Sequence, residues 1–141
     1  MIVFYDSSAL LKRYIEESGS NWLADRMDSD EDIHAISAIT HTELACVLAR
    51  RLKNPSATLK QLRIDISHLQ QVSVDEQVIA LSVKLGIHHR LRGCDALQLA
   101  CAVALHKAAP QLVMTFVCAD DQLNLAAHAE KLVVENPNSY P

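Results

Sequence analysis

The chain has 141 residues and a formal net charge of −4 at pH 7. This length fits one domain, which we expect to span residues 1–141. Half of the residues are hydrophobic and 21% are charged, a composition that excludes a disordered chain. The negative net charge excludes a globally basic surface for duplex DNA, so any contact with nucleic acid would use a local basic patch.

The cysteines and the hydropathy pattern indicate the compartment. The four cysteines form no CxxC pair: Cys46, Cys94, Cys101 and Cys118. The apolar residues Met1–Tyr5 lack the basic region and the length of a secretory leader. No apolar stretch approaches the roughly 18 residues of a membrane span. We therefore expect a reduced, cytoplasmic protein that does not enter a membrane.

Short apolar runs alternate with helical patterns along the whole chain. The expected strands are Ile2–Tyr5, Ile33–Ile36, Gln71–Val74, Val113–Cys118 and Leu132–Val134. The expected helices are residues 6–17, 38–54 and 56–69, then Glu76–Leu85, Asp95–Lys107 and Gln122–Lys131. Helix caps are expected at Ser7 or Ser8 and at Ser37, and Gly19 and Gly86 are each expected after the last turn of a helix.

Strands that alternate with helices predict an α/β fold with a parallel sheet covered by helices on both faces. Four acids map to the carboxyl edge of such a sheet, where ligands bind. Asp6 follows the first strand, and Asp120 lies two residues beyond the strand Val113–Cys118. Glu43 and Asp95 lie near the starts of two helices.

Any one of these acids is equally well explained as a helix cap or as a partner of the helix dipole. Four carboxylates at one edge would repel each other unless a cation lies between them. Mg²⁺ prefers oxygen ligands and needs few carboxylates. Such a site supports hydrolysis of a phosphodiester by an activated water. The histidines and cysteines show no ligand-spaced cluster, so a zinc site is not expected.

Four stretches of the chain carry a resemblance to a known family. In order, they are Ile2–Lys12, Ser37–Leu44, Leu91–Ala100 and Phe116–Leu123. Each resembles one motif of the PIN-domain nucleases, and they follow the family's order over nearly the whole chain. The subgroup that the chain resembles most is the VapC-type toxins of bacterial toxin–antitoxin pairs.

The resemblance implies a three-layer α/β/α PIN-like nuclease domain with a short central parallel sheet. It implies an Mg²⁺- or Mn²⁺-dependent endoribonuclease that hydrolyses RNA phosphodiester bonds. It also implies that a cognate antitoxin protein blocks the enzyme and that the chain forms a homodimer. By similarity to the family, water is the nucleophile, and the products carry 5′-phosphate and 3′-hydroxyl ends.

The resemblance also assigns roles to individual residues. It makes four acids the catalytic residues and metal ligands: Asp6, Glu43, Asp95 and Asp120. It gives Ser8 a supporting role through its hydroxyl, and Asp121 is an alternative to Asp120 that we rank second. Cys118 is a departure, because the family often has Thr or Ser there, and a thiol is a poor hydrogen-bond partner.

Basic residues near the motifs are candidates for contact with RNA. We expect Arg90 and Arg92 to contact phosphate because they precede Asp95 in sequence, and Lys12 is a third candidate. We explain Arg50, Arg51 and Lys53 instead as cations at the end of a helix.

Two alternatives to a nuclease remain open. One is a catalytically silent PIN-like module that binds proteins, although such a module would not need to keep four crowded acids. The other is an aspartyl-nucleophile phosphatase of the haloacid dehalogenase type, which also begins with a buried strand and an Asp. That enzyme class has a second Asp two residues later as its general acid, and this chain has Ser8 there.

Overall fold

The computed structural model describes residues 1–141 and contains five strands. They are β1 (Ile2–Tyr5), β2 (Ile33–Ser37), β3 (Gln70–Val72), β4 (Met114–Val117) and β5 (Val133–Glu135). All four pairings are parallel, and the strand order is β3-β2-β1-β4-β5. All five expected strands are therefore present, with shifts of one or two residues at their ends.

Seven α-helices connect the strands. They are α1 (Ser7–Leu10), α2 (Ser20–Met27), α3 (Thr40–Arg51), α4 (Ser56–Ser67), α5 (Glu76–His89), α6 (Gly93–Ala108) and α7 (Asp121–Ala129). Two 3₁₀ turns, η1 (Leu11–Arg13) and η2 (Pro137–Ser139), complete the elements. None of these helices has the length and hydropathy that crossing a bilayer requires.

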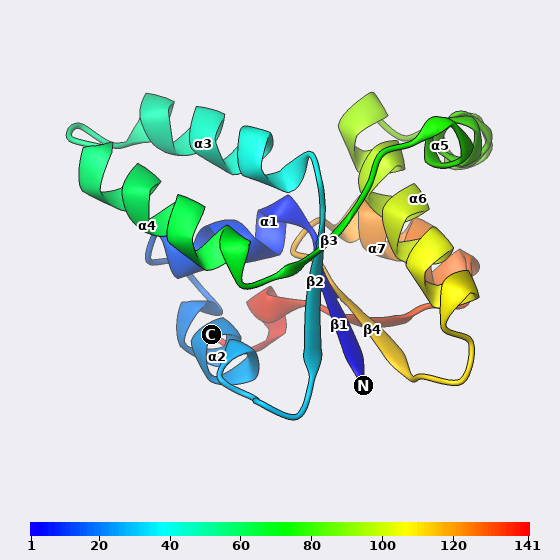
Figure 1. Cartoon of the computed structure of the whole chain (residues 1–141), viewed down its shortest axis with the longest axis horizontal. Helices are drawn as coiled ribbons and strands as arrows, with labels where there is room; N and C mark the ends of the chain where they lie inside the picture. Colours follow the sequence, from blue (N-terminus) through cyan, green and yellow to red (C-terminus); the bar gives the residue numbers. More distant parts are fainter.

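The sheet separates two hydrophobic clusters, because side chains alternate along β1. Ile2 and Phe4 belong to a cluster that includes residues of α5, α6 and α7. Val3 and Tyr5 belong to a second cluster with residues of α1, α2, α3 and α4. Figure 1 shows the two groups of helices on opposite sides of the strands. The fold is therefore a three-layer α/β/α domain with a short central parallel sheet, as predicted.

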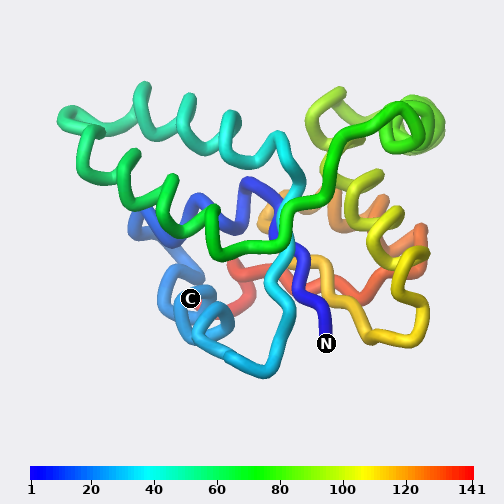
Figure 2. Tube along the Cα trace, viewed as in Figure 1, coloured from blue at the N-terminus to red at the C-terminus, as the bar shows by residue number.

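The two sides of the sheet differ in how their helices are arranged. On one side, α3 and α4 form a hairpin with its loop at the far left of the view (Figure 2). On the other side, α5 packs along α6. A side chain at Gly86 would bring its Cβ within 3.1 Å of the Cβ of Ala96, so glycine allows this close approach.

The expected end of α5 at Gly86 is therefore wrong. Gly86 lies inside the helix, which continues to His89. Arg90 instead adopts the left-handed conformation at the helix end, with φ of 54°. Packing against a neighbouring helix, rather than termination, explains this glycine.

The expected helix over residues 6–17 is also shorter. It consists of α1 and η1 and ends at Arg13, and its N-cap is Asp6 rather than Ser7 or Ser8. Gly19 precedes α2, a helix that the sequence did not predict, and has φ of 87°. A Cβ at Gly19 would lie 2.3 Å from the carbonyl oxygen of Pro137, so this turn requires glycine.

The cap of α3 differs from the prediction as well. Ser37 ends β2, and α3 begins only at Thr40. The Ser37 hydroxyl accepts a hydrogen bond from the backbone N–H of Ile39 in the intervening turn. The turn still carries Glu43 into the first turn of α3, at the carboxyl edge of the sheet.

Candidate active site

Asp6 lies at the end of the central strand. Its backbone N–H donates to the carbonyl of Val117, which extends the β1–β4 ladder by one residue. Its side chain is buried, and its Oδ2 accepts from the Ser8 backbone N–H at 3.0 Å and the Ser8 hydroxyl at 2.5 Å. Burial raises the pKa of Asp6 to about 6, although both bonds from Ser8 lower it. No basic side chain forms an ion pair with this buried carboxylate, and the nearby charges of Asp95 and Glu43 raise its pKa further.

Ser8 joins the loop after β1 to the loop after β4. Its Oγ donates to Asp6 and also accepts from the backbone N–H of Ala119 at 3.0 Å. The hydroxyl therefore fixes the Asp6 carboxylate relative to the segment that carries Asp120. The supporting role that the resemblance assigns to Ser8 stays a prediction.

Glu43 is held by two donors from different elements. The Ser7 hydroxyl donates to its Oε1 at 2.9 Å, and the Gln98 amide donates to the same oxygen at 2.7 Å. Ser7 begins α1 and Gln98 lies in the first half of α6, so the carboxylate connects three helices. No protein donor binds the second oxygen, Oε2.

Asp95 and Asp120 complete the group of acids. Asp95 lies in the first turn of α6 and is half-buried. Burial raises its pKa, the nearby charges of Asp120 and Glu43 raise it further, and Arg92 lowers it. Asp120 is exposed, and its Oδ1 caps α7 by accepting from the backbone N–H of Leu123 at 2.8 Å.

The four acids therefore lie at one edge of the sheet. The charges of Asp95 and Glu43 raise the pKa of Asp6. The charges of Asp120 and Glu43 in turn raise the pKa of Asp95. No three His, Cys, Asp or Glu side chains of the structure converge closely enough to hold a metal ion. Three of these carboxylates accept hydrogen bonds from protein donors: Asp6 from Ser8, Glu43 from Ser7 and Gln98, and Asp120 from the α7 backbone.

The chemistry of this donor set fits a hard divalent cation. All four acids offer oxygen, which Mg²⁺ and Mn²⁺ prefer, and Mg²⁺ binds through one or two carboxylates while it keeps several waters. The sulfur that contacts the buried Asp6, that of Cys118, is not an anionic ligand. Burial and the neighbouring Asp6 raise the pKa of this thiol far above its usual range.

Cys118 supports the site differently from the hydroxyl residue that is usual in the family. Its Sγ lies 3.6 Å from Oδ2 of Asp6 and 3.6 Å from Oγ of Ser8. It also accepts from the backbone N–H of Asp120 at 3.3 Å. The thiol thus contacts the Asp6 carboxylate and the Asp120 backbone, and makes no contact with the Asp120 carboxylate.

The side chains of two other predicted residues, Asp121 and Lys12, make their contacts outside the group of four acids. Asp121 accepts from the Asn136 side chain at 3.2 Å and lines a cavity with η2 and β5, so it is poorly placed to replace Asp120. Lys12 is buried, with 6% of its surface exposed, and its Nζ lies 3.7 Å from Glu17. This burial argues against the predicted contact of Lys12 with RNA.

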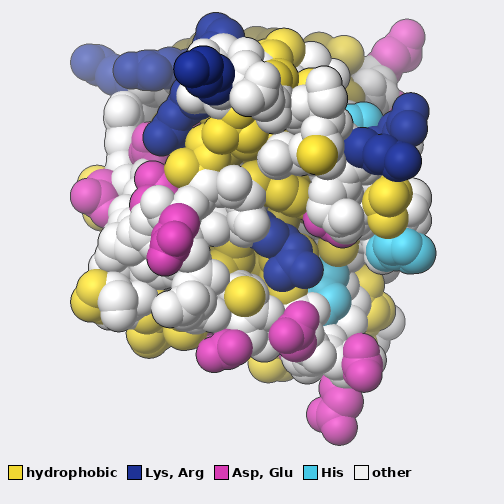
Figure 3. Space-filling view, turned by 90° about the vertical axis from the view of Figure 1, so that its left-hand side faces the viewer, with side chains coloured by type: hydrophobic (Ala, Val, Ile, Leu, Met, Phe, Trp, Pro, Cys, Tyr) yellow, Lys and Arg dark blue, Asp and Glu magenta, His cyan; other side chains and the backbone are white.

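The other basic residues are accessible. Arg90 and Arg92 are both exposed, and Arg92 is close enough to lower the pKa of Asp95. Lys and Arg side chains also gather at the end of the molecule formed by α3 and α4 (Figure 3). The exposed basic residues of these helices and their loop are Arg50, Arg51, Lys53, Lys60 and Arg63.

The sequence interpretation missed Ser7, Thr40 and Gln98. Gln98 donates from Nε2 to Oγ1 of Thr40 and to Oγ of Ser7, each at 2.9 Å, as well as to Glu43. The signal in the sequence was a polar residue on the buried face of an apolar helix, three positions after Asp95.

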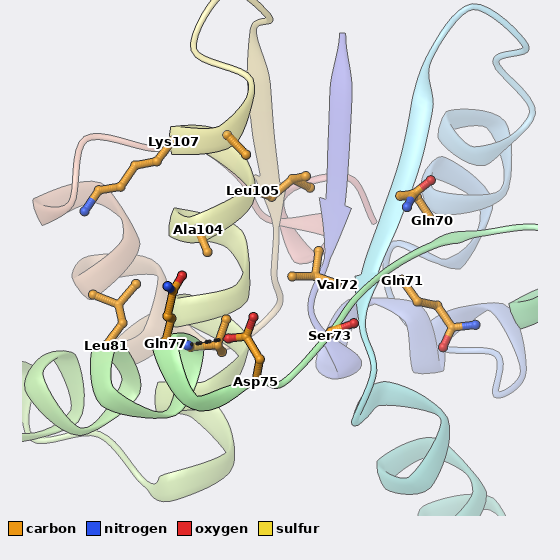
Figure 4. A pocket seen from close by; sticks show the side chains of 12 residues that line it. Gln70, Gln71, Val72, Ser73, Asp75, Gln77, Leu81, Ala104, Leu105 and Lys107 are labelled. Carbon is orange, nitrogen blue, oxygen red and sulfur yellow. Dashed lines mark hydrogen bonds between the residues drawn. The ribbon is translucent and has the colours of Figure 1, made fainter.

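The cavities of the structure do not include the four acids. One of about 440 Å³ lies between β3, α5 and α6 (Figure 4). Its polar residues include Asp75, which caps α5 by accepting from the backbone N–H of Val78 at 2.9 Å.

The chain matches a known protein family over most of its length. The family model of the PIN domain matches residues 3–129. The chain belongs to the PIN domain family. The match spans all four acids and confirms the resemblance to the family, whereas the roles of the four acids stay predictions. No match was found among curated protein sequences.

Solved structures with the same fold include several toxin–antitoxin proteins. A chain of VapBC2 from Rickettsia felis, bound to a DNA fragment from their promoter, has a TM-score of 0.72 and 17% identity, with 96% of this chain and 98% of that chain covered. A chain of a toxin–antitoxin complex from Klebsiella pneumoniae has a TM-score of 0.70 and 18% identity, with 96% of this chain and 97% of that chain covered. A chain of VapBC-5 from Mycobacterium tuberculosis has a TM-score of 0.60 and 19% identity, with 96% of each chain covered. At these identities, the likeness shows the fold.

Proposed function

We propose that the chain is a single-domain, Mg²⁺- or Mn²⁺-dependent endoribonuclease and the toxin of a toxin–antitoxin pair. The observation that carries the proposal is the group of four acids at one sheet edge, with Asp6 buried and no basic side chain bound to it. A fold does not keep such a group for stability, because the negative charge of the buried Asp6, which has no cationic partner, destabilises the folded protein.

The residues of the site would have three roles: binding the metal, positioning a ligand and accepting a proton. Asp6, Asp95, Asp120 and Glu43 would hold the metal. A bound divalent cation lowers the pKa of water and stabilises negative charge on the phosphate. Ser8 keeps the Asp6 carboxylate in place, and the free Oε2 of Glu43 is available to accept a proton from water.

RNA would approach the same edge over exposed basic residues. Arg90 and Arg92 lie just before Asp95 and are free to contact phosphate. Because the overall charge is negative, these local contacts would offset the repulsion between RNA and the acids.

The toxin assignment is supported by the structural neighbours, several of which are described as toxin–antitoxin complexes. It implies a cognate antitoxin that covers the site, a homodimer and a cytoplasmic location. These partners follow from the neighbours and the resemblance rather than from a contact in this structure.

The first test is RNA cleavage by the purified protein with Mg²⁺ or Mn²⁺. Asp6→Asn and Asp95→Asn should each lower the rate by about 10²-fold or more, because each removes charge from the metal-binding group. Asp25→Asn is the matched control, since it removes an exposed acid from α2. Cleavage at the wild-type rate in both site variants would refute the mechanism, and a folded wild-type protein with no Mn²⁺ response would favour the silent module.

The second test addresses the toxin role. Expression in a bacterial host should arrest growth, and co-expression of the product of the neighbouring gene should relieve the arrest. Asp6→Asn should abolish the arrest at equal protein level. Arrest that persists with this variant would contradict a toxin that acts through this site.

A further inference from the structure

Gln98 is a buried polar residue in an apolar environment. Its side chain is 1% exposed, and its neighbours in α6 include Leu99, Ala100 and Cys101, all fully buried in the core. Burying an amide costs free energy unless its polar atoms are hydrogen-bonded. The contacts of this amide therefore indicate why it is tolerated.

The amide is satisfied on one side only. Its Nε2 lies within 2.9 Å of three acceptors, on Ser7, Thr40 and Glu43, whereas its Oε1 is buried without any partner. The amide nitrogen faces Glu43, because the amide N–H groups donate and the carboxylate oxygen accepts. An apolar side chain of similar size would fill this space without leaving a buried oxygen unsatisfied, which destabilises the folded protein.

Gln98 acts on only one oxygen of Glu43. Its Nε2 and the Ser7 hydroxyl both donate to Oε1, and together they fix the carboxylate from two directions. Oε2 keeps its full capacity to accept. A carboxylate held in this way presents one oxygen in a defined position, close to the charges of Asp6 and Asp95 that it would otherwise avoid.

We propose that Gln98 is a positioning residue, which holds Glu43 by Oε1 so that Oε2 is free for a cation or a water. The proposal rests on the proposed function and extends it to a residue 55 positions from Glu43. Gln98 itself binds neither metal nor RNA. Its effect on the reaction passes through the Glu43 carboxylate.

The test compares Gln98→Met with wild type in Mn²⁺ binding, measured by calorimetry, and in RNA cleavage. Methionine fills the same volume without donating. We expect Mn²⁺ affinity and kcat each to fall about 10-fold, as for other residues that orient metal ligands, with KM for RNA unchanged. The thermal midpoint without metal should fall no more than that of Thr115→Val, a control at a buried polar position of β4.

A double-mutant cycle tests whether the effect passes through Glu43. In a Glu43→Ala background, Gln98→Met should leave the remaining Mn²⁺ affinity unchanged. An equal loss of affinity in both backgrounds would overturn the proposal. If Gln98→Met does not fold, Gln98→Asn replaces it, because its amide is one methylene too short to reach Glu43 and the same losses are expected.

The results also separate this inference from the proposed function. Wild-type protein that neither binds Mn²⁺ nor cleaves RNA would refute the proposed function. Wild-type protein that does both, with Gln98→Met unchanged in Mn²⁺ affinity and kcat, would refute only the role of Gln98. A fall in thermal midpoint with unchanged Mn²⁺ affinity would likewise show that Gln98 is merely structural.

Discussion

Acids at the two ends of the sheet have pKa values that are shifted in opposite directions. At the amino end, Asp32 precedes β2 and lies 2.6 Å from Arg26 and 3.3 Å from the N-terminal amine of Met1. The hydrogen bond from Arg26 is the main reason why the pKa of Asp32 is lowered to about 2. At the carboxyl end, burial and neighbouring acids raise the pKa of Asp6 to about 6 and also raise that of Asp95.

This difference separates charge that stabilises the fold from charge that does not. Asp32 is ionised more readily in the folded protein than in the unfolded chain, so its charge favours folding. Asp6 is ionised less readily, so its charge opposes folding at neutral pH. The same sheet thus carries one compensated acid, Asp32, at its amino end and an uncompensated group of acids at its carboxyl end, which a bound cation would compensate.

Neutralising Asp6 should give the largest change in stability. Asp6→Asn removes a buried charge whose pKa rises from 3.8 to about 6 on folding. We expect the free energy of unfolding at pH 7.5, measured by urea denaturation in EDTA, to increase by about 3 kcal/mol. Asp25→Asn, with its exposed acid, should leave it within about 0.5 kcal/mol. A less stable Asp6→Asn protein would mean that Asp6 is compensated in solution.

Adding a cation should offset the destabilising effect of the Asp6 charge without a mutation. If Mn²⁺ binds the folded protein alone, a concentration 100 times its dissociation constant should stabilise the wild type by about 2.7 kcal/mol. The measurement is the urea midpoint with Mn²⁺ against EDTA, with Ca²⁺-free buffer throughout. Asp6→Asn should show little of this response. An equal Mn²⁺ response in both proteins would place the ion elsewhere.

The pH dependence should show the two ends of the sheet separately. For Asp6 the folded pKa is the higher one, so protonation favours the folded state and stability without metal should rise as pH falls. Between pH 7.5 and pH 5 we expect a gain of about 1.5 kcal/mol from Asp6, and Asp95 should add in the same direction. Urea midpoints in EDTA across this range test the sign. A flat profile that Asp6→Asn does not alter would contradict the raised pKa.

The sequence was most informative where a residue's role depends on its place along the chain. The strands, and the acids that follow them, were predictable because β-branched and apolar runs define strands, and parallel strands all end at one edge. Asp6, Glu43, Asp95 and Asp120 could therefore be assigned to one side before their contacts were known. The four stretches that resemble family motifs also follow one another in the order that is typical of the family, which supported the assignment.

What could not be predicted depends on contacts between distant segments. Gly86 has the appearance of a helix end, and only the approach of α6 explains why it lies inside α5. α2 has one fully buried residue, Leu23, and so too weak an apolar pattern to be recognised. The bond from Gln98 to Glu43 is equally invisible, because no local rule joins two helices 55 residues apart.

The smallest expected effect lies at the compensated end. Asp32→Asn removes the negative partner of Arg26 and of the N-terminal amine, a pair that is partly exposed and so screened by solvent. We expect the free energy of unfolding at pH 7 to decrease by about 1 kcal/mol, opposite in sign to Asp6→Asn. The deficit should shrink as pH falls below 3.8 toward 2, because the wild-type carboxyl then also becomes neutral. Urea midpoints at pH 7 and pH 3 measure it, and a stabilised Asp32→Asn protein would remove the contrast between the two ends, because both groups of acids would then oppose folding.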